Sequence, residues 1–177
     1  MRIEVTWDVF KLAEVFTISR GSRTEAKVLT VRLHAGGVTG WGECVPYARY
    51  GETLESVTAE IEALPGDITR RSLYDLLPAG AARNAVDCAL WDLEAKQAGK
   101  RVWELAGLTQ PGPEITAYTL SLASPAEMQV QAAKHAHRPL LKIKLGTPDD
   151  MPRLEAVRAG APKSTIIVDA NEGWSAG

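Results

Sequence analysis

The sequence predicts an α+β region followed by a βα-repeat region. Hydrophobic residues alternate with a period of two up to Cys44 and recur with a period near 3.6 between about residues 54 and 98. Beyond Pro113 the pattern becomes strand, helix, strand, helix, strand with short connections, which indicates parallel strands with right-handed crossovers. Such a repeat begins either a doubly wound sheet or a β/α barrel, and the periodicity does not distinguish them.

The first 44 residues read as an antiparallel sheet. Alternation of apolar and polar residues over 3–9 predicts a half-buried strand, and residues 16–18 a short second one. The cationic segment 20–23 is expected to be a mobile loop. Residues 26–33 and 38–44 are rich in apolar and β-branched residues on either side of Gly36-Gly37, so they predict a hairpin.

Helices are expected to follow this sheet. Thr53 is a suitable N-cap for a helix that Pro65-Gly66 ends, and Gly99 is a suitable C-cap for a longer, alanine-rich helix over 81–98. A further short turn is expected at 101–106. The segment 109–113, which reads TQPGP, is the predicted linker.

Strands are predicted after the linker at 115–122, 139–145 and 165–169. The sequence SPAE at 124–127 offers a capping serine, a proline at the first helical position and a glutamate three residues after the cap, which predicts a helix to about His137. The sequence TPDD at 147–150 predicts a second helix, which Gly160 and Pro162 end.

Composition excludes several classes of protein. The chain has 177 residues, 20 Lys plus Arg against 22 Asp plus Glu, and 45% hydrophobic residues. Charges are interspersed, so nucleic acid and anionic membranes are poor candidate partners. We expect no signal peptide, and the two cysteines form no disulfide framework, so a reducing cytoplasmic compartment fits best. The length excludes a complete eightfold β/α barrel.

Two lysines on one predicted strand are the first candidates for chemistry. In LLKIKLG, Lys142 and Lys144 share one face of the strand, and the leucines and isoleucine share the other. A barrel lumen would accommodate the lysines, and neighbouring ammonium groups disfavour each other's charged form, which favours a general base near neutral pH. A solvated edge strand is the commoner explanation for a lone pair of lysines at this spacing.

A carboxylate at the end of the next strand is the second candidate. Asp169 follows an apolar strand, with Asn171 two residues later, and its oxygens suit Mg²⁺. An aspartate that caps a following helix is an equally good explanation of this residue alone. Lys144 and Asp169 lie 25 residues apart, about one helix-and-strand unit, so we expect them at equivalent ends of neighbouring strands.

Four ordered motifs carry a resemblance to a known family: GWGECVPY, AARNAVDCALWDLEAKQAGK, LLKIKLG and VDANEGW. Together they resemble the N-terminal half of enolase-superfamily proteins of the muconate-lactonizing subgroup. The segments FTISRGSRTEAKV and GECVPYARYGE resemble the L-Ala-D/L-Glu epimerases, the dipeptide epimerases, most. The resemblance implies an α+β capping domain over 1–110 and the first three strands of a modified, TIM-like β/α barrel over 114–177.

The resemblance also implies roles for individual residues. Lys144 matches the catalytic acid/base that moves the proton α to a carboxylate, and Lys142 matches the companion lysine that holds that carboxylate. Asp169 matches the first of three acidic Mg²⁺ ligands. Thr119 and Arg20 match substrate-binding positions, Arg20 for the distal carboxylate of a glutamyl dipeptide. Further lid contacts (Arg23, Arg49, Tyr50) and packing positions (Glu43, Trp91, Asp92) complete the correspondence.

The implied activity is a Mg²⁺-dependent isomerase that epimerises a dipeptide at its glutamyl α-carbon through an enolate, in line with the Lys or His base and Mg²⁺ of enolase-superfamily sites in general. The implied partner is a small-molecule dipeptide, and a homo-oligomer is left open. Because the second base and two metal ligands lie later in the family's barrel, we expect these 177 residues to be inactive alone. The alternatives are a non-catalytic fragment or pseudo-enzyme, a muconate cycloisomerase and an o-succinylbenzoate synthase.

Overall fold

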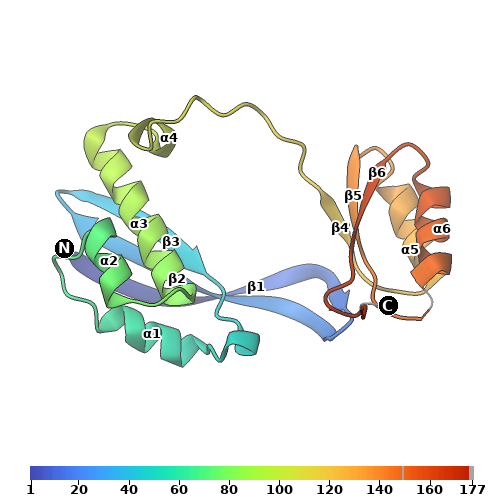
Figure 1. Ribbon diagram of the computed structural model, residues 1–177, viewed down its shortest axis with the longest axis horizontal. Coiled ribbons are helices and arrows are strands. Elements are labelled where there is room, and N and C mark those ends of the chain that lie inside the picture. The colour runs from blue at the N-terminus through green and yellow to red at the C-terminus, as the bar shows by residue number, and fades with distance from the viewer. Residues whose placement is uncertain (149, 176–177) are drawn as a thin grey trace. The chain divides into compact units, whose positions relative to one another are not determined.

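The computed structural model describes residues 1–148 and 150–175 (Figure 1). Within these ranges the strands form two three-stranded sheets, β1-β2-β3 and β4-β5-β6. The chain divides into two compact units, Met1–Phe10 with Ala26–Gly112 and Lys11–Glu25 with Pro113–Gly177. No helix in the described ranges is long and apolar enough to cross a membrane.

The first sheet consists of β1 (Arg2–Ile18), β2 (Gly21–Ala35) and β3 (Val38–Cys44). The predicted hairpin is confirmed, since β2 and β3 pair antiparallel from Leu29 opposite Cys44 to Ala35 opposite Val38. The turn between them uses Gly36 and Gly37 at φ of 60° and 78°, which favours glycine.

Two predictions about this sheet are wrong. The two short strands at 3–9 and 16–18 are one continuous strand, and the loop predicted at 20–23 shrinks to a two-residue turn because residues 21–23 belong to β2. Side chains over 21–25 are exposed on both faces of the strand, so the segment shows no hydrophobic period. Its backbone lies in the strand conformation all the same, which hydrophobic alternation does not reveal.

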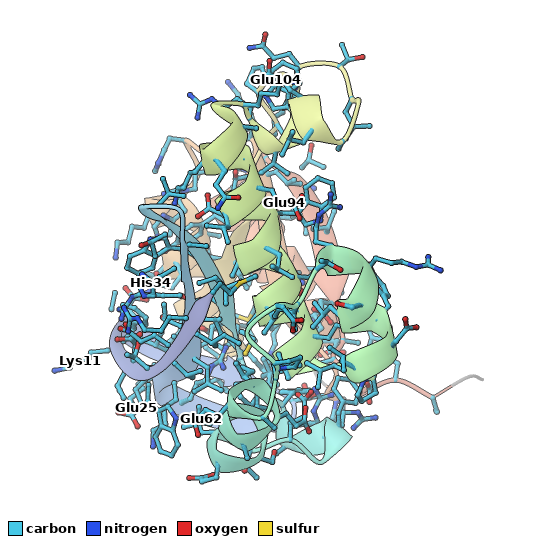
Figure 2. The ribbon with its side chains drawn as sticks, turned by 90° about the vertical axis from the view of Figure 1, so that its left-hand side faces the viewer. Lys11, Glu25, His34, Glu62, Glu94 and Glu104 are labelled. Atoms are coloured by element: carbon cyan, nitrogen blue, oxygen red, sulfur yellow. The ribbon has the colours of Figure 1, made fainter. Side chains whose placement is uncertain are left out.

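Helices α1 (Leu54–Glu62), α2 (Arg70–Leu76) and α3 (Ala81–Ala98) pack against the first sheet (Figure 1), and α4 (Val102–Leu105) follows them. Figure 2 labels Glu62 on α1, Glu94 on α3 and His34 on β2. The cap at Thr53 and the left-handed cap at Gly99 are as predicted. Helix α2 was missed, although Thr69 and Ser72 form a capping box at its start.

Helix α3 lies directly on the backbone of β3. A Cβ atom at Gly42 would meet the carbonyl oxygen of Ala85 at 2.0 Å, and one at Gly40 would meet that of Ala89 at 2.2 Å. Only glycine allows an approach this close. The alanine-rich face of α3 was predicted to let another element approach closely, and β3 is that element, because the small side chains leave room for its backbone.

The second sheet is parallel, with β4 (Tyr118–Leu120) beside β5 (Leu140–Lys144) and β5 beside β6 (Thr165–Asp169). Helices α5 (Pro125–Lys134) and α6 (Asp150–Gly160) lie on one side of it (Figure 1). The Ser124 capping box and the proline at the start of α5 are as predicted. Asp149, in the predicted start of α6, is outside the described residues.

Strand β4 is shorter than the strand predicted at 115–122, and α5 ends at Lys134 rather than near His137. Residues 115 and 116 are exposed, and the register with β5 extends only over 118–120. The apolar and β-branched residues of 115–122 predict a strand, but the backbone hydrogen bonds to β5 form only where β5 lies beside the segment.

Candidate active site

Three charged side chains predicted to act together meet at the end of the second sheet. Lys144 on β5 lies opposite Asp169 on β6 in the parallel register. Its ammonium nitrogen is 2.7 Å from Asp169 Oδ2, and that of Lys142 is 2.8 Å from the same oxygen. One carboxylate oxygen therefore bridges both lysines.

Alternation along β5 explains why both lysines point the same way. Leu141, Ile143 and Leu145 are buried in the core that the sheet shares with α5 and α6. Lys142 and Lys144 take the opposite face. The edge-strand alternative is wrong, because β5 is the middle strand of the sheet and the Lys144 side chain is only 8% exposed.

The Asp169 carboxylate is held in its ionised form. Hydrogen bonds from Lys142 and Lys144, and a third from the backbone N–H of Asn171, keep the pKa of Asp169 well below its usual range. The Asn171 N–H donates to Oδ1 at 2.9 Å, so each carboxylate oxygen has its own donors. The helix-capping alternative is not observed within the described residues 170–175, which contain a turn and no helix.

The turn between β1 and β2 contacts the segment that follows β6. Arg20 Nη1 donates to the carbonyl oxygen of Asn171 at 2.5 Å and lies 3.7 Å from the Glu172 carboxylate. Ser19 Oγ donates to the same carbonyl at 3.3 Å. The predicted substrate ligand Arg20 is thus brought near Asp169, where its guanidinium binds protein backbone.

Thr119 and Arg23 lie around one hollow of about 430 Å³ between the far end of β1 and β4. The guanidinium carbon of Arg23 lies 5.4 Å from the centre of the Phe16 ring, and Lys144 Nζ lies 5.9 Å from that same centre. The two cations are therefore within about 11 Å of each other. The hollow is lined by residues of β1, β2, α5 and the β4 segment: Leu12, Ala13, Glu14, Val15, Phe16, Arg23, Tyr118, Thr119, Ser121 and Lys134.

The remaining predicted positions belong to the first unit. Arg49 and Tyr50 lie in the short 3-10 segment Ala48–Tyr50. The guanidinium carbon of Arg70 lies over the Trp91 ring, 3.5 Å from the centre of that ring. Asp92 Oδ2 accepts hydrogen bonds from the backbone N–H of Trp41 at 2.8 Å and from Lys96 at 2.5 Å. These contacts of Trp91 and Asp92 are structural and lie within the unit.

Sequence reasoning missed Asp150 and Trp174. Asp150 Oδ2 accepts hydrogen bonds from the Trp174 indole at 2.7 Å and from the Gly146 N–H at 2.9 Å, and Oδ1 accepts one from the Thr147 N–H at 3.0 Å. Burial opposes ionisation of Asp150, but these bonds outweigh it and hold its pKa below the ordinary value. The signal was an aspartate shortly after the Lys144 strand and a tryptophan shortly after the Asp169 strand.

The site can supply one carboxylate to a metal ion. Within residues 1–148 and 150–175, no three His, Cys, Asp or Glu side chains gather as a metal centre. The oxygens present are nevertheless of the type that Mg²⁺ prefers, since Asp169 is ionised and Asn171 Oδ1 is buried without a hydrogen-bond partner among the described residues. The geometry therefore offers one ionised carboxylate with an ammonium pair beside it.

Comparison with known proteins identifies the family of the chain. Residues 2–107 match the mandelate racemase / muconate lactonizing enzyme N-terminal domain. An L-Ala-D/L-Glu epimerase of Escherichia coli K12 is 44% identical over 98% of this chain and 56% of its own length. An N-acetyl-D-glutamate racemase of a Pseudoalteromonas species is 46% identical over 76% of this chain and 44% of its own length.

Solved structures give the same result. An enolase family member of Agrobacterium tumefaciens with homology to dipeptide epimerases, crystallised with sodium and L-Ala-L-Glu, is 56% identical, with a TM-score of 0.92 over 97% of this chain and 54% of that chain. A dipeptide epimerase of Cytophaga hutchinsonii, complexed with Mg and D-Ala-L-Val, is 28% identical, with a TM-score of 0.86 over 98% of this chain and 52% of that chain.

The chain spans about half the length of the relatives it matches. The predicted fold class, a capping domain followed by the first part of a β/α barrel, is confirmed by these matches, and so is the resemblance to dipeptide epimerases. The chain belongs to the mandelate racemase / muconate lactonizing enzyme family of the enolase superfamily.

Proposed function

We propose that this chain is the N-terminal part of a Mg²⁺-dependent dipeptide epimerase that inverts the glutamyl α-carbon of L-Ala-Glu. The observation that carries the proposal is the contact of Lys142 and Lys144 with one oxygen of Asp169, at 2.8 and 2.7 Å. A base beside a cation and a metal ligand is what removal of a weakly acidic proton next to a carboxylate requires. Relatives whose names state dipeptide epimerisation support the substrate class.

Lys144 is the proposed acid/base, because it is the more buried of the two lysines and lies opposite the metal ligand in the register. Lys142, whose side chain is 34% exposed, is proposed to bind the substrate carboxylate and to neutralise the charge that develops there. Inversion needs a second base on the opposite face of the substrate. We propose that this base, like the other metal ligands, lies outside these 177 residues.

Asp169 is the proposed Mg²⁺ ligand of this chain. When bound, Mg²⁺ supplies positive charge to the substrate carboxylate as the α-proton leaves. Its Oδ2 atom contacts both lysines, and its Oδ1 atom accepts a hydrogen bond from the Asn171 N–H. Metal binding and the lysine contacts therefore share one carboxylate.

For the distal carboxylate of the substrate we propose Arg20, with Arg23 as the alternative. Arg23 lines the same hollow as Thr119 and lies within about 11 Å of Lys144, since both cations contact the Phe16 ring. A glutamyl side chain places its carboxylate a few ångströms from the α-carbon, so this spacing suits it. Arg20 donates to the carbonyl of Asn171, two residues after the proposed metal ligand Asp169. We expect Arg20→Lys to raise KM for L-Ala-L-Glu about tenfold, the loss expected for one charge-assisted hydrogen bond, and Arg23→Lys to change it less.

The domain bounds stay proposals: a capping domain over 1–110 and a barrel part over 114–177. A cytoplasmic location is proposed as well, supported by Cys44 and Cys88, which are both free thiols. A homo-oligomer remains open.

Hydrogen exchange at the substrate tests the function. The whole gene product, loaded with Mg²⁺, is incubated with L-Ala-L-Glu in D₂O, and deuterium at the glutamyl α-carbon is followed by NMR. We expect exchange and inversion to the D-epimer in the wild type, no inversion in Lys144→Ala, and wild-type exchange and inversion in Lys163→Ala, which removes an exposed lysine before β6. A folded, metal-loaded wild type that does not exchange contradicts the epimerase. Inversion by Lys144→Ala contradicts the role of that lysine, because the second base alone can exchange the proton of one epimer but cannot invert the carbon.

The 46% identity to an N-acetyl-D-glutamate racemase favours a second candidate, racemisation of an N-acylated glutamate. Both substrates present the same α-proton and the same distal carboxylate, and only the dipeptide carries an ammonium group. Running the exchange assay with N-acetyl-glutamate beside L-Ala-L-Glu distinguishes the two by their kcat/KM values.

A further inference from the structure

The turn that follows β6 has an unusual backbone. Asn171 and Glu172 have φ of 49° and 62°, two consecutive left-handed residues that are not glycine. The Gly173 N–H closes the turn by donating to the Ala170 carbonyl at 2.9 Å. Side chains disfavour this region of the backbone map, so such a turn persists only where its surroundings hold it.

Asp150 and Trp174 hold this turn at its C-terminal end. The Trp174 indole N–H donates to Asp150 Oδ2 at 2.7 Å, immediately after the turn. The Asp150 side chain is only 13% exposed and also accepts the N–H groups of Gly146 and Thr147. Because Gly146 follows the Lys144 strand, one buried carboxylate connects the segment after β5 with the segment after β6.

Close backbone contact strengthens this connection. A Cβ atom at Gly173 would meet the Gly146 carbonyl oxygen at 2.6 Å and its Cα atom at 2.7 Å. The Leu145 N–H also donates to the Asp169 carbonyl at 3.1 Å. The two segments therefore touch through glycine, and the Asp150–Trp174 bond lies just beyond the point of contact.

The turn in its left-handed form has a direct consequence for Asp169. It places the Asn171 N–H 2.9 Å from Oδ1 of that carboxylate. With Oδ1 held there, Oδ2 is directed at Lys142 and Lys144. If the turn relaxes, the Asn171 N–H leaves Oδ1 and the carboxylate can rotate about its Cβ–Cγ bond.

We propose that Asp150 and Trp174 are positioning residues for the active site: their hydrogen bond holds the 170–173 turn in its left-handed form, which keeps the Asn171 N–H on Asp169 and orients that carboxylate for the lysines and the metal. The part concerning the metal rests on the proposed function. The part concerning the Asn171 N–H rests on the geometry of this chain alone.

Trp174→Phe is the decisive variant, because it keeps an aromatic ring and removes the indole N–H donor, and because the residue is 59% exposed the smaller ring costs little packing. Trp7→Phe is the matched control: Trp7 is 50% exposed and donates its indole N–H to Thr58 at 2.9 Å in the first unit. In the whole gene product with EDTA, amide exchange of Asn171 is measured by NMR, with the melting temperature alongside. Mg²⁺ affinity is then measured by titration calorimetry.

We expect Trp174→Phe to speed exchange of the Asn171 amide about tenfold and to weaken Mg²⁺ binding by a similar factor, as for the loss of one charge-assisted hydrogen bond. The melting temperature should match that of Trp7→Phe, which leaves both other quantities at wild-type values. Asp150→Asn should act in the same direction, and combining it with Trp174→Phe should add little.

Unchanged exchange of the Asn171 amide in Trp174→Phe overturns the proposal, whatever the metal does. The proposal is also overturned if the Asn171 amide exchanges faster but the melting temperature falls well below that of Trp7→Phe, because the variant has then lost structure in general. Faster exchange in a protein whose wild type binds no Mg²⁺ upholds the positioning of Asp169 and contradicts the metal part of the proposed function, so the two failures are distinguishable.

Discussion

Asp169→Asn tests how the lysine pair is stabilised. The substitution keeps the shape of the side chain and removes the negative charge that lies 2.7 Å from Lys144 and 2.8 Å from Lys142. Breaking a buried ion pair by removing one partner costs about 3–5 kcal/mol. Here Asp169 and Lys142 are about one-third exposed while Lys144 is buried, so solvent screening reduces the expected cost to about 2 kcal/mol at pH 7.

The assay is amide exchange of β5 and β6 in EDTA, because it reports on the second sheet alone. A loss of about 2 kcal/mol corresponds to exchange about 30-fold faster in Asp169→Asn than in the wild type. Adding Lys144→Met should restore part of the protection, since it removes the ammonium group left without a counter-charge. Wild-type exchange in Asp169→Asn, or a double variant worse than the sum of the singles, would refute the reasoning.

Three further predictions concern stability. Because the folded-state pKa of Asp169 is lowered, its ion pairs stabilise the protein fully above the ordinary pKa and lose effect as the pH falls below about 4, so the difference between wild type and Asp169→Asn in urea titrations should shrink there. Gly42→Ala should lower the unfolding free energy by about 3 kcal/mol, since its Cβ would meet a backbone oxygen at 2.0 Å, whereas Gly112→Ala, which meets nothing within 4 Å, should be neutral by calorimetry. Glu52→Gln should cost about 1 kcal/mol in the same measurement, because Glu52 accepts the Ala81 N–H at the N-terminus of α3.

Local signals were sufficient for the well-capped helices. Thr53 and Ser124 cap α1 and α5 as predicted, and Gly99 ends α3 in the left-handed conformation. In each case the residue that sets the boundary hydrogen-bonds within three or four positions of itself, or adopts a backbone conformation of its own. Short-range chemistry of this kind can be read from sequence.

Elements that depend on a distant partner were predicted less well. Residues 21–25 of β2 are exposed, and their strand conformation owes nothing to a hydrophobic period. The alternation over 3–9 predicted the first part of β1 but not its continuation to Ile18. Helix α2 has seven residues, fewer than a reliable amphipathic period needs. Strand β4 is limited to the three residues that find a partner on β5.

Alternation on β5 by itself determined that Lys142 and Lys144 share one face, and the spacing of one helix-and-strand unit placed Asp169 on the neighbouring strand, because a strand has a period of two and a parallel crossover has a typical length. Only the tertiary structure decided that one Asp169 oxygen bridges both lysines, that Arg20 binds the backbone at Asn171, and that Trp174 reaches Asp150. Those contacts depend on register and on segments up to 151 residues apart, and no local pattern encodes such a distance.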